Sequence, residues 1–372
     1  MSGTILIIGG AGFIGSHTAD RLLALGYHVR VLDNLQKPVH TKGKPEYLDP
    51  AIQFIHADAR DRDALLRALR GADAVYHLAA YQDYLNDFST FFHVNAVSTA
   101  LLYELIVGER LPVKKVVVAS SQFVQGEGRY LRQDGQIIAP TLRPIEQLQR
   151  GQWDWVDETG APLQWQWTAE DHVNPPNAYA LSKHSQEQQA MRFGLRYGIP
   201  STALRYSIVQ GARQSFYNAY SGACRIFCLH YLLGRAPTLY EDGQQHRDFV
   251  NIHDVVDANI LALHDPRTDY QVLNVGGGKA YTVAEFDRIV AGAFGKQELQ
   301  PNIPGQFRFG DTRNACSDTA KLQSLGWQPR RTPHDSVREY VEYLQGQSDL
   351  QQILDHAEKT MKGMNVVQSI NK

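Results

Sequence analysis

Residues 4–34, TILIIGGAGFIGSHTADRLLALGYHVRVLDN, decide the fold of this 372-residue chain. Residues 5–8 are continuously apolar, as a strand buried on both faces of a parallel sheet requires. Gly9, Gly10, Gly12 and Gly15 follow, residues 16–27 have the apolar spacing of a helix, and residues 28–33 form a second strand. The order strand, glycine turn, helix, strand is typical of a dinucleotide-binding unit.

The glycines of such a unit have a physical purpose. They allow a tight turn, a close approach of backbone to a pyrophosphate at the helix N-terminus, and close packing of helix on strand. Asp33 ends the second strand, where a carboxylate can bind both hydroxyls of the adenosine ribose. Because Asp33 would repel a 2′-phosphate, the sequence predicts NAD rather than NADP. A glycine turn without a ligand is the alternative, and the surrounding strand, helix and acid disfavour it.

The alternation of strands and helices continues along the chain. Strands are expected at 52–58, 72–80, 114–121 and 201–209, and helices at 63–71 and 88–109. Repeated units of this kind predict an α/β fold with a doubly wound parallel sheet. Ligands then bind beyond the carboxyl ends of the strands. The residues expected at that edge are Gly12, Asp33, Asp58, Ala79 and Ser121.

Composition excludes several classes of protein. The net charge is -2 and no long run of like charge occurs, which argues against nucleic-acid and membrane surfaces. The chain enters its first strand at once, so no signal peptide is expected. Three cysteines (Cys224, Cys228, Cys316) have no metal-ligand spacing, so we expect core thiols in a reducing cytoplasm and no bound metal.

Residues 177–183, NAYALSK, place Tyr179 and Lys183 four residues apart. On a helix this spacing puts both side chains on one face. There the ammonium can lower the pKa of the phenol, so that the tyrosine can act as a general base. Two helix surface residues that are neighbours by chance are the alternative, and the pair by itself does not decide between them.

Beyond these patterns, the chain resembles a known family. The motifs that carry the resemblance are GGAGFIG, HLAA, SSQFVQG, YALSK, LRYSIVQGARQ, RDFVNIHDVVDAN and LNVGGG. Together they resemble the extended short-chain dehydrogenase/reductase family, and within it the nucleotide-sugar epimerase and dehydratase group, over most of the chain. A long segment between the motifs at 120–126 and 179–183 is most similar to dTDP-L-rhamnose 4-epimerase-like members.

The resemblance implies roles for individual residues. Tyr179 is expected to be the catalytic base, Lys183 to bind the nicotinamide ribose and tune the tyrosine, and Ser121 to hydrogen-bond the reacting hydroxyl. The NAD-binding residues expected are Gly9, Gly12, Phe13, Ile14, Gly15, Asp33, Asn34, Asp58, Ala59, Leu78, Ala79, Ala80, Asn95, Ser120, Tyr179, Lys183 and Tyr206. The substrate-binding residues expected are Ser121, Gln122, Arg247 and Arg313. Both arginines are expected at the substrate diphosphate, with surface salt bridges as their alternative.

The function implied is C4 epimerisation of a nucleotide-diphosphate sugar through a transient 4-keto sugar, with NAD regenerated. The alternatives on the same scaffold are a dehydrogenase or reductase and a decarboxylase, and an NAD-sensing protein without catalysis is a further one. Gln122 and Phe123 replace the Asp-Glu pair that sugar dehydratases carry after the serine, so dehydration is disfavoured. Four further residues depart from the usual residues of the family. Gln125 and Gln210 replace tyrosines and are expected near the sugar, and Ser207-Ile208 replace a Phe-Asn pair, so that Ile208 removes a polar contact with the substrate phosphate or base.

Domain boundaries follow from the same comparison. We expect an NAD-binding domain at 1–206, which takes back a strand near 272–276, and an interleaved substrate domain at 207–345. The insertion at about 126–174 holds Trp153, Trp155, Trp165 and Trp167. We expect it to be an ordered loop beside the active site, with at most a short helix near 144–150 and its tryptophans packed together or stacked on the ligand. The tail, 346–372, is expected to be a polar helix with a frayed end. The helical segments 89–106 and 179–195 are expected to form a homodimer interface, or else an internal contact.

Overall fold

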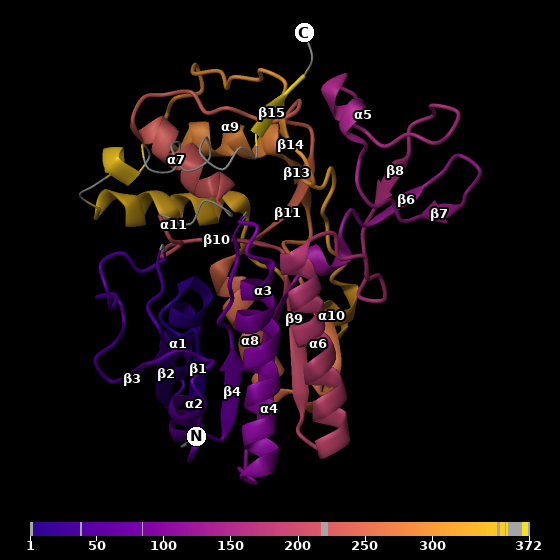
Figure 1. The fold of residues 1–372 in the computed structure, drawn as a ribbon. Coiled ribbons are helices and arrows are strands. Elements are labelled where there is room, and N and C mark those ends of the chain that lie inside the picture. Colours follow the sequence, from indigo (N-terminus) through magenta and orange to yellow (C-terminus); the bar gives the residue numbers. More distant parts are fainter. Residues whose placement is uncertain are drawn as a thin grey trace.

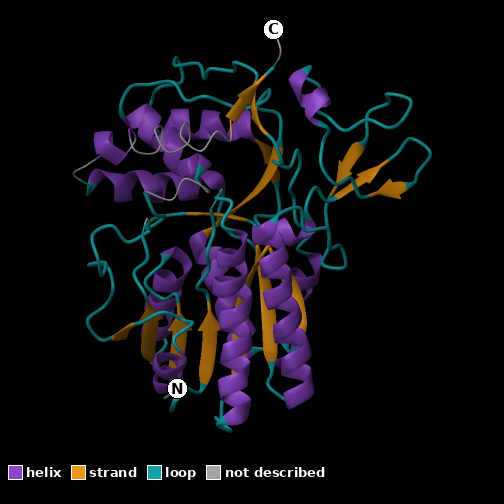
Figure 2. Cartoon of the chain, in the orientation of Figure 1, coloured by secondary structure: helices purple, strands orange, loops and turns teal. Residues whose placement is uncertain are grey.

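The computed structural model describes residues 3–37, 39–83, 85–216, 222–347, 350–353, 355 and 367–370. A large lobe holds the main sheet with helices on both faces, and a smaller lobe lies beyond the carboxyl ends of its strands (Figures 1 and 2). The insertion projects sideways from the junction of the two lobes.

The main sheet has seven parallel strands in the order β12-β9-β5-β4-β1-β2-β3. Their bounds are β1 (Thr4–Ile8), β2 (His28–Asp33), β3 (Gln53–His56), β4 (Ala74–His77), β5 (Lys115–Ser121), β9 (Ser201–Tyr206) and β12 (Gln271–Val275). The doubly wound α/β fold expected from the sequence is confirmed. The strand expected near 272–276 is β12, at the edge of the sheet.

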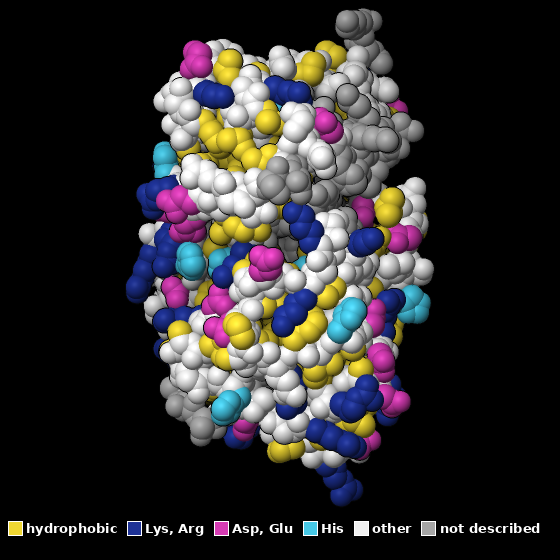
Figure 3. All heavy atoms as spheres, turned by 90° about the vertical axis from the view of Figure 1, so that its left-hand side faces the viewer, with side chains coloured by type: hydrophobic (Ala, Val, Ile, Leu, Met, Phe, Trp, Pro, Cys, Tyr) yellow, Lys and Arg dark blue, Asp and Glu magenta, His cyan; other side chains and the backbone are white. Residues whose placement is uncertain are grey.

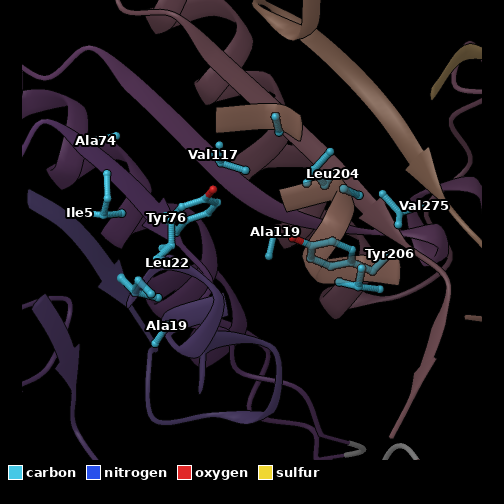
Figure 4. Packing of buried hydrophobic residues seen from close by; sticks show 14 of the residues in the cluster. Ile5, Ala19, Leu22, Ala74, Tyr76, Val117, Ala119, Leu204, Tyr206 and Val275 are labelled. Carbon is cyan, nitrogen blue, oxygen red and sulfur yellow. The ribbon is translucent and has the colours of Figure 1, made fainter. Parts of the chain in front are cut away.

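Helices cover both faces of this sheet. One face carries α1 (Phe13–Ala24), α8 (Ile252–His264) and α10 (Ala320–Ser324), and the other carries α2 (Arg62–Leu69), α4 (Ser98–Gly108) and α6 (Ala178–Tyr197). Alternate residues of β1 point to opposite clusters, Ile5 and Ile7 to the first and Leu6 and Ile8 to the second. Figure 4 shows the first cluster, in which side chains from several strands meet Leu22 of α1. Each large side chain buried in this way contributes roughly 1.5–3 kcal/mol.

The helix expected at 88–109 is interrupted. It consists of α3 (Phe88–Phe91), a π-helical segment η1 (Phe92–Val97) and α4. The run Phe88–Gly108 is long and apolar enough to cross a membrane, but a core helix passes the same test. Half of its apolar window is buried, and α4 packs against the sheet.

The smaller lobe has its own core. A three-stranded sheet of β10 (Ile208–Gln210), β11 (His246–Asn251) and β13 (Ala280–Thr282) lies beside α7 (Ala223–Leu232), α9 (Val283–Ala293) and α11 (Pro333–Gln345). Their apolar side chains form one cluster that contains Phe227, Phe286 and Tyr340. The segment 207–345 is therefore shared between the lobes, because α8, β12 and α10 return to the main sheet.

The insertion contains more regular structure than expected. The short helix is present as α5 (Ile145–Gln149), but a three-stranded antiparallel sheet accompanies it. The strands of that sheet are β6 (Arg129–Leu131), β7 (Ile137–Ile138) and β8 (Gln164–Gln166). Strands this short give little periodic signal, so the prediction of a loop was wrong here.

The tail also differs from its prediction. Residues 350–353 and 355 are helical, but β15 (Val367–Ser369) pairs antiparallel with β14 (Gln306–Arg308) instead of fraying. The rest of the expected helix, 356–366, lies outside the described residues. Two short 3-10 helices, η2 (Gln122–Gln125) and η3 (Pro266–Thr268), complete the secondary structure described. The three cysteines are buried and form no disulfide.

Candidate active site

One large cavity of about 1400 Å³ runs along the carboxyl ends of the main strands and under the smaller lobe. The five residues expected at that edge, Gly12, Asp33, Asp58, Ala79 and Ser121, all line it. The volume exceeds the roughly 300–1,000 Å³ typical of a site for one small ligand. The lining includes seven Lys or Arg side chains, which suits anionic ligands: Lys37, Lys42, Lys44, Lys183, Arg213, Arg247 and Arg308. On the face seen in Figure 3, basic side chains gather at about mid-height.

The glycine turn is built for close approach. Gly9 has φ +81°, and a Cβ there would lie 2.4 Å from the Ala79 amide nitrogen. A Cβ on Gly15 would lie 2.3 Å from the Gly9 carbonyl oxygen, so α1 packs on the turn only without a side chain. Gly12 precedes α1 and provides no side-chain cap. The first N–H groups of this helix are therefore available to a phosphate.

Two carboxylates stand at the adenosine end of the cavity. Asp33 accepts hydrogen bonds from the Ala11 N–H (3.0 Å) and the Leu35 N–H (2.9 Å), which fix its orientation. Asp58 is bound by Arg60 and by the Asn34 amide, and its hydrogen bond with Arg60 lowers the pKa of Asp58 to about 2. Asp58 is therefore ionised at neutral pH. A cofactor phosphate beside the carboxylate of Asp33 would be repelled.

Most of the other residues predicted to bind NAD also line the cavity. They are Gly9, Phe13, Ile14, Gly15, Asn34, Ala59, Leu78, Ala80, Ser120, Tyr179, Lys183 and Tyr206. The hydroxyls of Ser120 and Tyr206 are already used, because they donate to Glu187 (2.9 Å) and Asn259 (2.6 Å). The hydroxyl hydrogens of these two residues are therefore not available to donate to a ligand.

Asn95 lies elsewhere than predicted. It is fully buried in η1, does not line the cavity, and donates to the Tyr81 carbonyl (3.1 Å) and the Ser182 hydroxyl (2.9 Å). The Tyr81 N–H donates to its oxygen (2.8 Å). Asn95 thus connects the loop after β4 to α6, and its hydrogen bonds hold Tyr81, which lines the cavity.

Ser121, Tyr179 and Lys183 meet at the middle of the cavity. Asn177 caps α6 by accepting from the Ala180 N–H (2.9 Å), and the helix then presents Tyr179 and Lys183 on one buried face. The hydroxyls of Ser121 and Tyr179 share a hydrogen bond, which lowers the pKa of the phenol. Burial has the larger effect and raises the pKa of Tyr179 to about 12. The expectation that Lys183 tunes the phenol is not visible in the ligand-free chain.

The contacts of Lys183 explain why it has no visible effect on the pKa of Tyr179. Its ammonium donates to the Ala119 carbonyl (2.7 Å) and the Gln186 side-chain oxygen (2.9 Å), and burial lowers the pKa of Lys183 to about 7. Two of the three N–H donors of an ammonium are thereby used. The remaining donor has no partner among the described residues, and Lys183 lines the cavity. It can therefore serve a hydroxyl of a bound ligand.

Gln122, next to Ser121, has a buried side-chain amide without a hydrogen-bond partner, as has Gln210. The residue is 4% exposed and lines the cavity, and neither atom of its amide has a partner in the structure. An unpartnered buried amide costs free energy unless something fills it. A polar ligand bound in the cavity beside Ser121 could satisfy this amide.

The two predicted arginines lie in different environments. Arg247 lines the cavity and donates to three carbonyl oxygens, those of His246 (2.8 Å), Arg313 (3.0 Å) and Thr312 (2.8 Å). Within the described ranges, no carboxylate lies within ion-pair distance of Arg247. Its charge is oriented without being neutralised, as an anion-binding group requires.

Arg313 does not line the cavity, which differs from the prediction that it contacts the substrate. Its guanidinium is 2% exposed and bound by Asp154 (2.8 Å), Glu241 (3.0 Å) and Asp242 (2.7 Å). Arg308, five residues earlier, lines the cavity instead and pairs with Asp311. The sequence stretch FRFGDTR contains both arginines, and no periodicity distinguishes them.

Two departures from the family pattern have structural explanations. Gln125 does not line the cavity, because its amide donates to the Thr168 (3.0 Å) and Ala169 (3.1 Å) carbonyls of the insertion. Gln210 is 1% exposed and also lies off the cavity, so the expectation that both approach the sugar was wrong. Ile208 does line the cavity and places an apolar side chain there.

None of the four tryptophans of the insertion lines the cavity. Trp165 packs edge-on against Trp167 (5.8 Å between ring centroids) and packs at a tilt against His246 (4.9 Å). Trp153 packs on Phe307 of the smaller lobe (6.0 Å). Of the two alternatives, packing is therefore what the structure shows.

Comparison with known proteins agrees with this geometry. The family model described as "NAD dependent epimerase/dehydratase family" matches residues 5–147 and 155–276. The chain belongs to this family. A dTDP-L-rhamnose 4-epimerase of Burkholderia thailandensis is 34% identical over 88% of this chain and 90% of its own length.

Solved structures of relatives share the fold. A UDP-glucose 4-epimerase of Thermotoga maritima with UDP-glucose has a TM-score of 0.74 and 29% identity, over 92% of this chain and 98% of that one. A UDP-glucose 4-epimerase of Thermus thermophilus in complex with NAD has a TM-score of 0.71 and 29% identity, over 93% and 100%. The dependence on NAD expected from Asp33 is thus a property of the family.

Proposed function

We propose that this chain is an NAD-dependent nucleotide-sugar epimerase that inverts C4 of an NDP-hexose or NDP-6-deoxyhexose. The observation that carries the proposal is the arrangement of one cavity. Ser121 and Tyr179 share a hydrogen bond in its wall, the glycine turn lies on one side, and Arg247 offers an unneutralised charge on another. The dTDP-L-rhamnose 4-epimerase and the UDP-glucose 4-epimerases that resemble this chain support the assignment.

The residues present fit NAD. The turn around Gly12 and the open N-terminus of α1 would hold the pyrophosphate, Asp33 the adenosine ribose, and the free donor of Lys183 the nicotinamide ribose. Bound NAD would supply the hydride acceptor and a positive charge beside the phenol, which favours the phenolate. That charge would offset the rise in the pKa of Tyr179 caused by burial.

The proton chemistry is assigned to this chain's own side chains. Tyr179, as phenolate, removes the proton of the C4 hydroxyl, while the Ser121 hydroxyl holds the same oxygen. After the 4-keto sugar has rotated to present its opposite face, Tyr179 returns the proton to the C4 oxygen, and the other epimer is formed. Arg247 and Arg308 would hold the diphosphate throughout, so that only the sugar rotates. The volume of the cavity, about 1400 Å³, leaves room for cofactor and substrate together.

One experiment tests the proposal and its alternatives. The purified protein is incubated with NAD and a panel of dTDP- and UDP-sugars, and products are characterised by mass and by NMR. We expect a product of unchanged mass with C4 inverted and no net formation of NADH. Loss of carbon dioxide would indicate a decarboxylase, and net NADH a dehydrogenase. Binding of NAD without turnover of any sugar would favour an NAD-sensing protein.

We also propose that the protein is a cytoplasmic homodimer. Exposed apolar side chains lie on the helices expected to pair, with Phe88 (58% exposed), Val97 (47%), Leu181 (45%) and Leu195 (63%) among them. Apolar side chains on the surface of two neighbouring helices are typical of an interface. Leu195→Asp should shift the protein to a monomer in analytical ultracentrifugation. A wild-type protein that sediments as a monomer would contradict the proposal.

A further inference from the structure

We propose that Arg143, in the insertion, is a positioning residue for nucleotide-sugar binding. It holds the backbone at Asp311, in the segment 311–313 to which the side chains of both cavity arginines are hydrogen-bonded. The inference rests on the proposed function, in which those arginines bind the substrate diphosphate. It gives the insertion a task in the reaction although none of its residues lines the cavity.

Arg143 is a buried cation with an almost complete set of partners. Its side chain is 1% exposed. One terminal nitrogen donates to the Trp153 carbonyl (2.9 Å) and to Glu241 (2.9 Å), and the other to Glu241 (2.7 Å) and to the Asp311 carbonyl (2.9 Å). A two-pronged guanidinium is the side chain that can bind a carboxylate and a neighbouring carbonyl in one geometry.

The segment that Arg143 holds is the one that orients the cavity arginines. Arg247 donates to the Thr312 (2.8 Å) and Arg313 (3.0 Å) carbonyls, while Arg308 donates to the Asp311 carboxylate (2.7 Å). Asp311 and Thr312 themselves line the cavity. A shift of this backbone would therefore move both guanidinium groups relative to a bound diphosphate.

The insertion holds the same segment at two further points. Glu127 accepts from the Arg313 N–H (2.8 Å) and the Asn314 N–H (3.2 Å). Asp154 accepts from the Arg313 guanidinium (2.8 Å). Side chains from three separate parts of the insertion thus converge on residues 311–314. Packing of tryptophans alone would not require such a convergence of charged groups.

The experiment compares Arg143→Met with a matched control, Arg129→Met. Arg129 is also in the insertion and also forms an ion pair (Asp171, 2.9 Å), but within the described part of the chain it has no hydrogen bond or ion pair with residues 311–314. The readouts are KM and kcat for the sugar substrate, the Kd of UDP or dTDP by calorimetry, the Kd of NAD, and Tm.

For Arg143→Met we expect KM and the Kd of the nucleoside diphosphate to rise by about 10- to 100-fold, since misplacement of binding groups by about 1 Å has effects of this size. The values of kcat and the Kd of NAD should stay within about twofold, because Ser121, Tyr179 and Lys183 are not attached to the segment. Arg129→Met should change neither KM nor either Kd. A fall in Tm with unchanged KM and Kd would overturn the inference, because it would show a purely structural role.

If Arg143→Met fails to fold, Arg143→Lys is used to test the positioning role instead. A lysine keeps the charge against Glu241 but cannot reproduce the fork that also reaches the Asp311 carbonyl. A raised Kd for the nucleoside diphosphate in this variant supports the inference, and wild-type affinity overturns it. The calorimetric arm does not depend on turnover. A wild-type chain that binds the nucleoside diphosphate without epimerising any sugar would refute the proposed reaction alone.

Discussion

Replacement of Tyr179 by phenylalanine separates the chemistry of the site from its architecture. The substitution removes one oxygen from a side chain that is 7% exposed and keeps the ring, including its edge-on contact with Phe123 (6.4 Å between centroids). The hydrogen bond with Ser121 is lost, which costs stability by about 0.5–1.5 kcal/mol. The glycine turn, Asp33 and the donor of Lys183 are unaffected, so NAD should bind as before.

The expected loss of turnover is much larger than the loss of stability. Removal of a general base costs about 100- to 10,000-fold in rate. This corresponds to about 2.7–5.5 kcal/mol in the activation free energy, at about 1.36 kcal/mol for each factor of ten. If Tyr179 is catalytic, the change in activation free energy should be several times greater than the change in unfolding free energy. If Tyr179 were only a surface residue, neither free energy should change.

The assay measures kcat on the identified sugar, the Kd of NAD by calorimetry, and Tm. Tyr103→Phe is the matched control, because it removes a buried phenol oxygen bonded to Ser201 (2.7 Å) at a position away from the cavity. The control should lose some stability and keep its turnover. If Tyr179→Phe kept more than about a tenth of wild-type turnover, general-base catalysis by this residue would be refuted.

Four further predictions concern other residues of the site. Arg247→Ala should weaken binding of the nucleoside diphosphate by about 1.5–3 kcal/mol in calorimetry. Arg313→Ala should mainly lower Tm, because it removes a buried guanidinium that is bound by Asp154, Glu241 and Asp242. Equal effects of both substitutions on Kd would contradict the assignment of the two arginines. Gln122→Leu should raise KM for the sugar and leave the Kd of NAD unchanged, as measured by steady-state kinetics beside calorimetry. The wild type should bind NAD more tightly than NADP, and Asp33→Ala should reduce this preference; tighter binding of NADP to the wild type would be inconsistent with the position of Asp33. Burial lowers the pKa of Lys183 to about 7. Between pH 7 and about 10.4 the unfolded chain therefore binds one more proton at this lysine than the folded chain does, so the free energy of unfolding rises with pH. Urea unfolding of the cofactor-free protein should show a smaller rise between pH 7 and 9 in Lys183→Met than in the wild type.

The fold was predictable because its signals are local in the sequence. The apolar run of residues 5–8 satisfies a strand that must be buried on both faces, and β1 has that burial. Gly9 and Gly15 stand where any Cβ would collide with backbone. These requirements involve neighbours within one βαβ unit, and short-range patterns can express them.

The parts that could not be predicted depend on distant partners. Arg308 and Arg313 differ because Asp154 and Glu241, far away in the sequence, bind one of them and not the other. Gln125 turned away from the cavity because carbonyls of the insertion accept from its amide. A motif identifies the residue type at a position, but the direction of its side chain is decided by what the rest of the chain places beside it.

The edge position of β12 has a consequence for synthesis of the chain. The main sheet cannot be completed until Val275 has left the ribosome, because β12 pairs with β9 and is separated from it in the sequence by β10, α7 and β11 of the smaller lobe. Until then β9 is itself an edge, with a row of unpaired N–H and C=O groups open to other strands. A fragment that stops at residue 206 keeps that edge exposed, and is therefore prone to aggregate rather than to behave as an independent nucleotide-binding module.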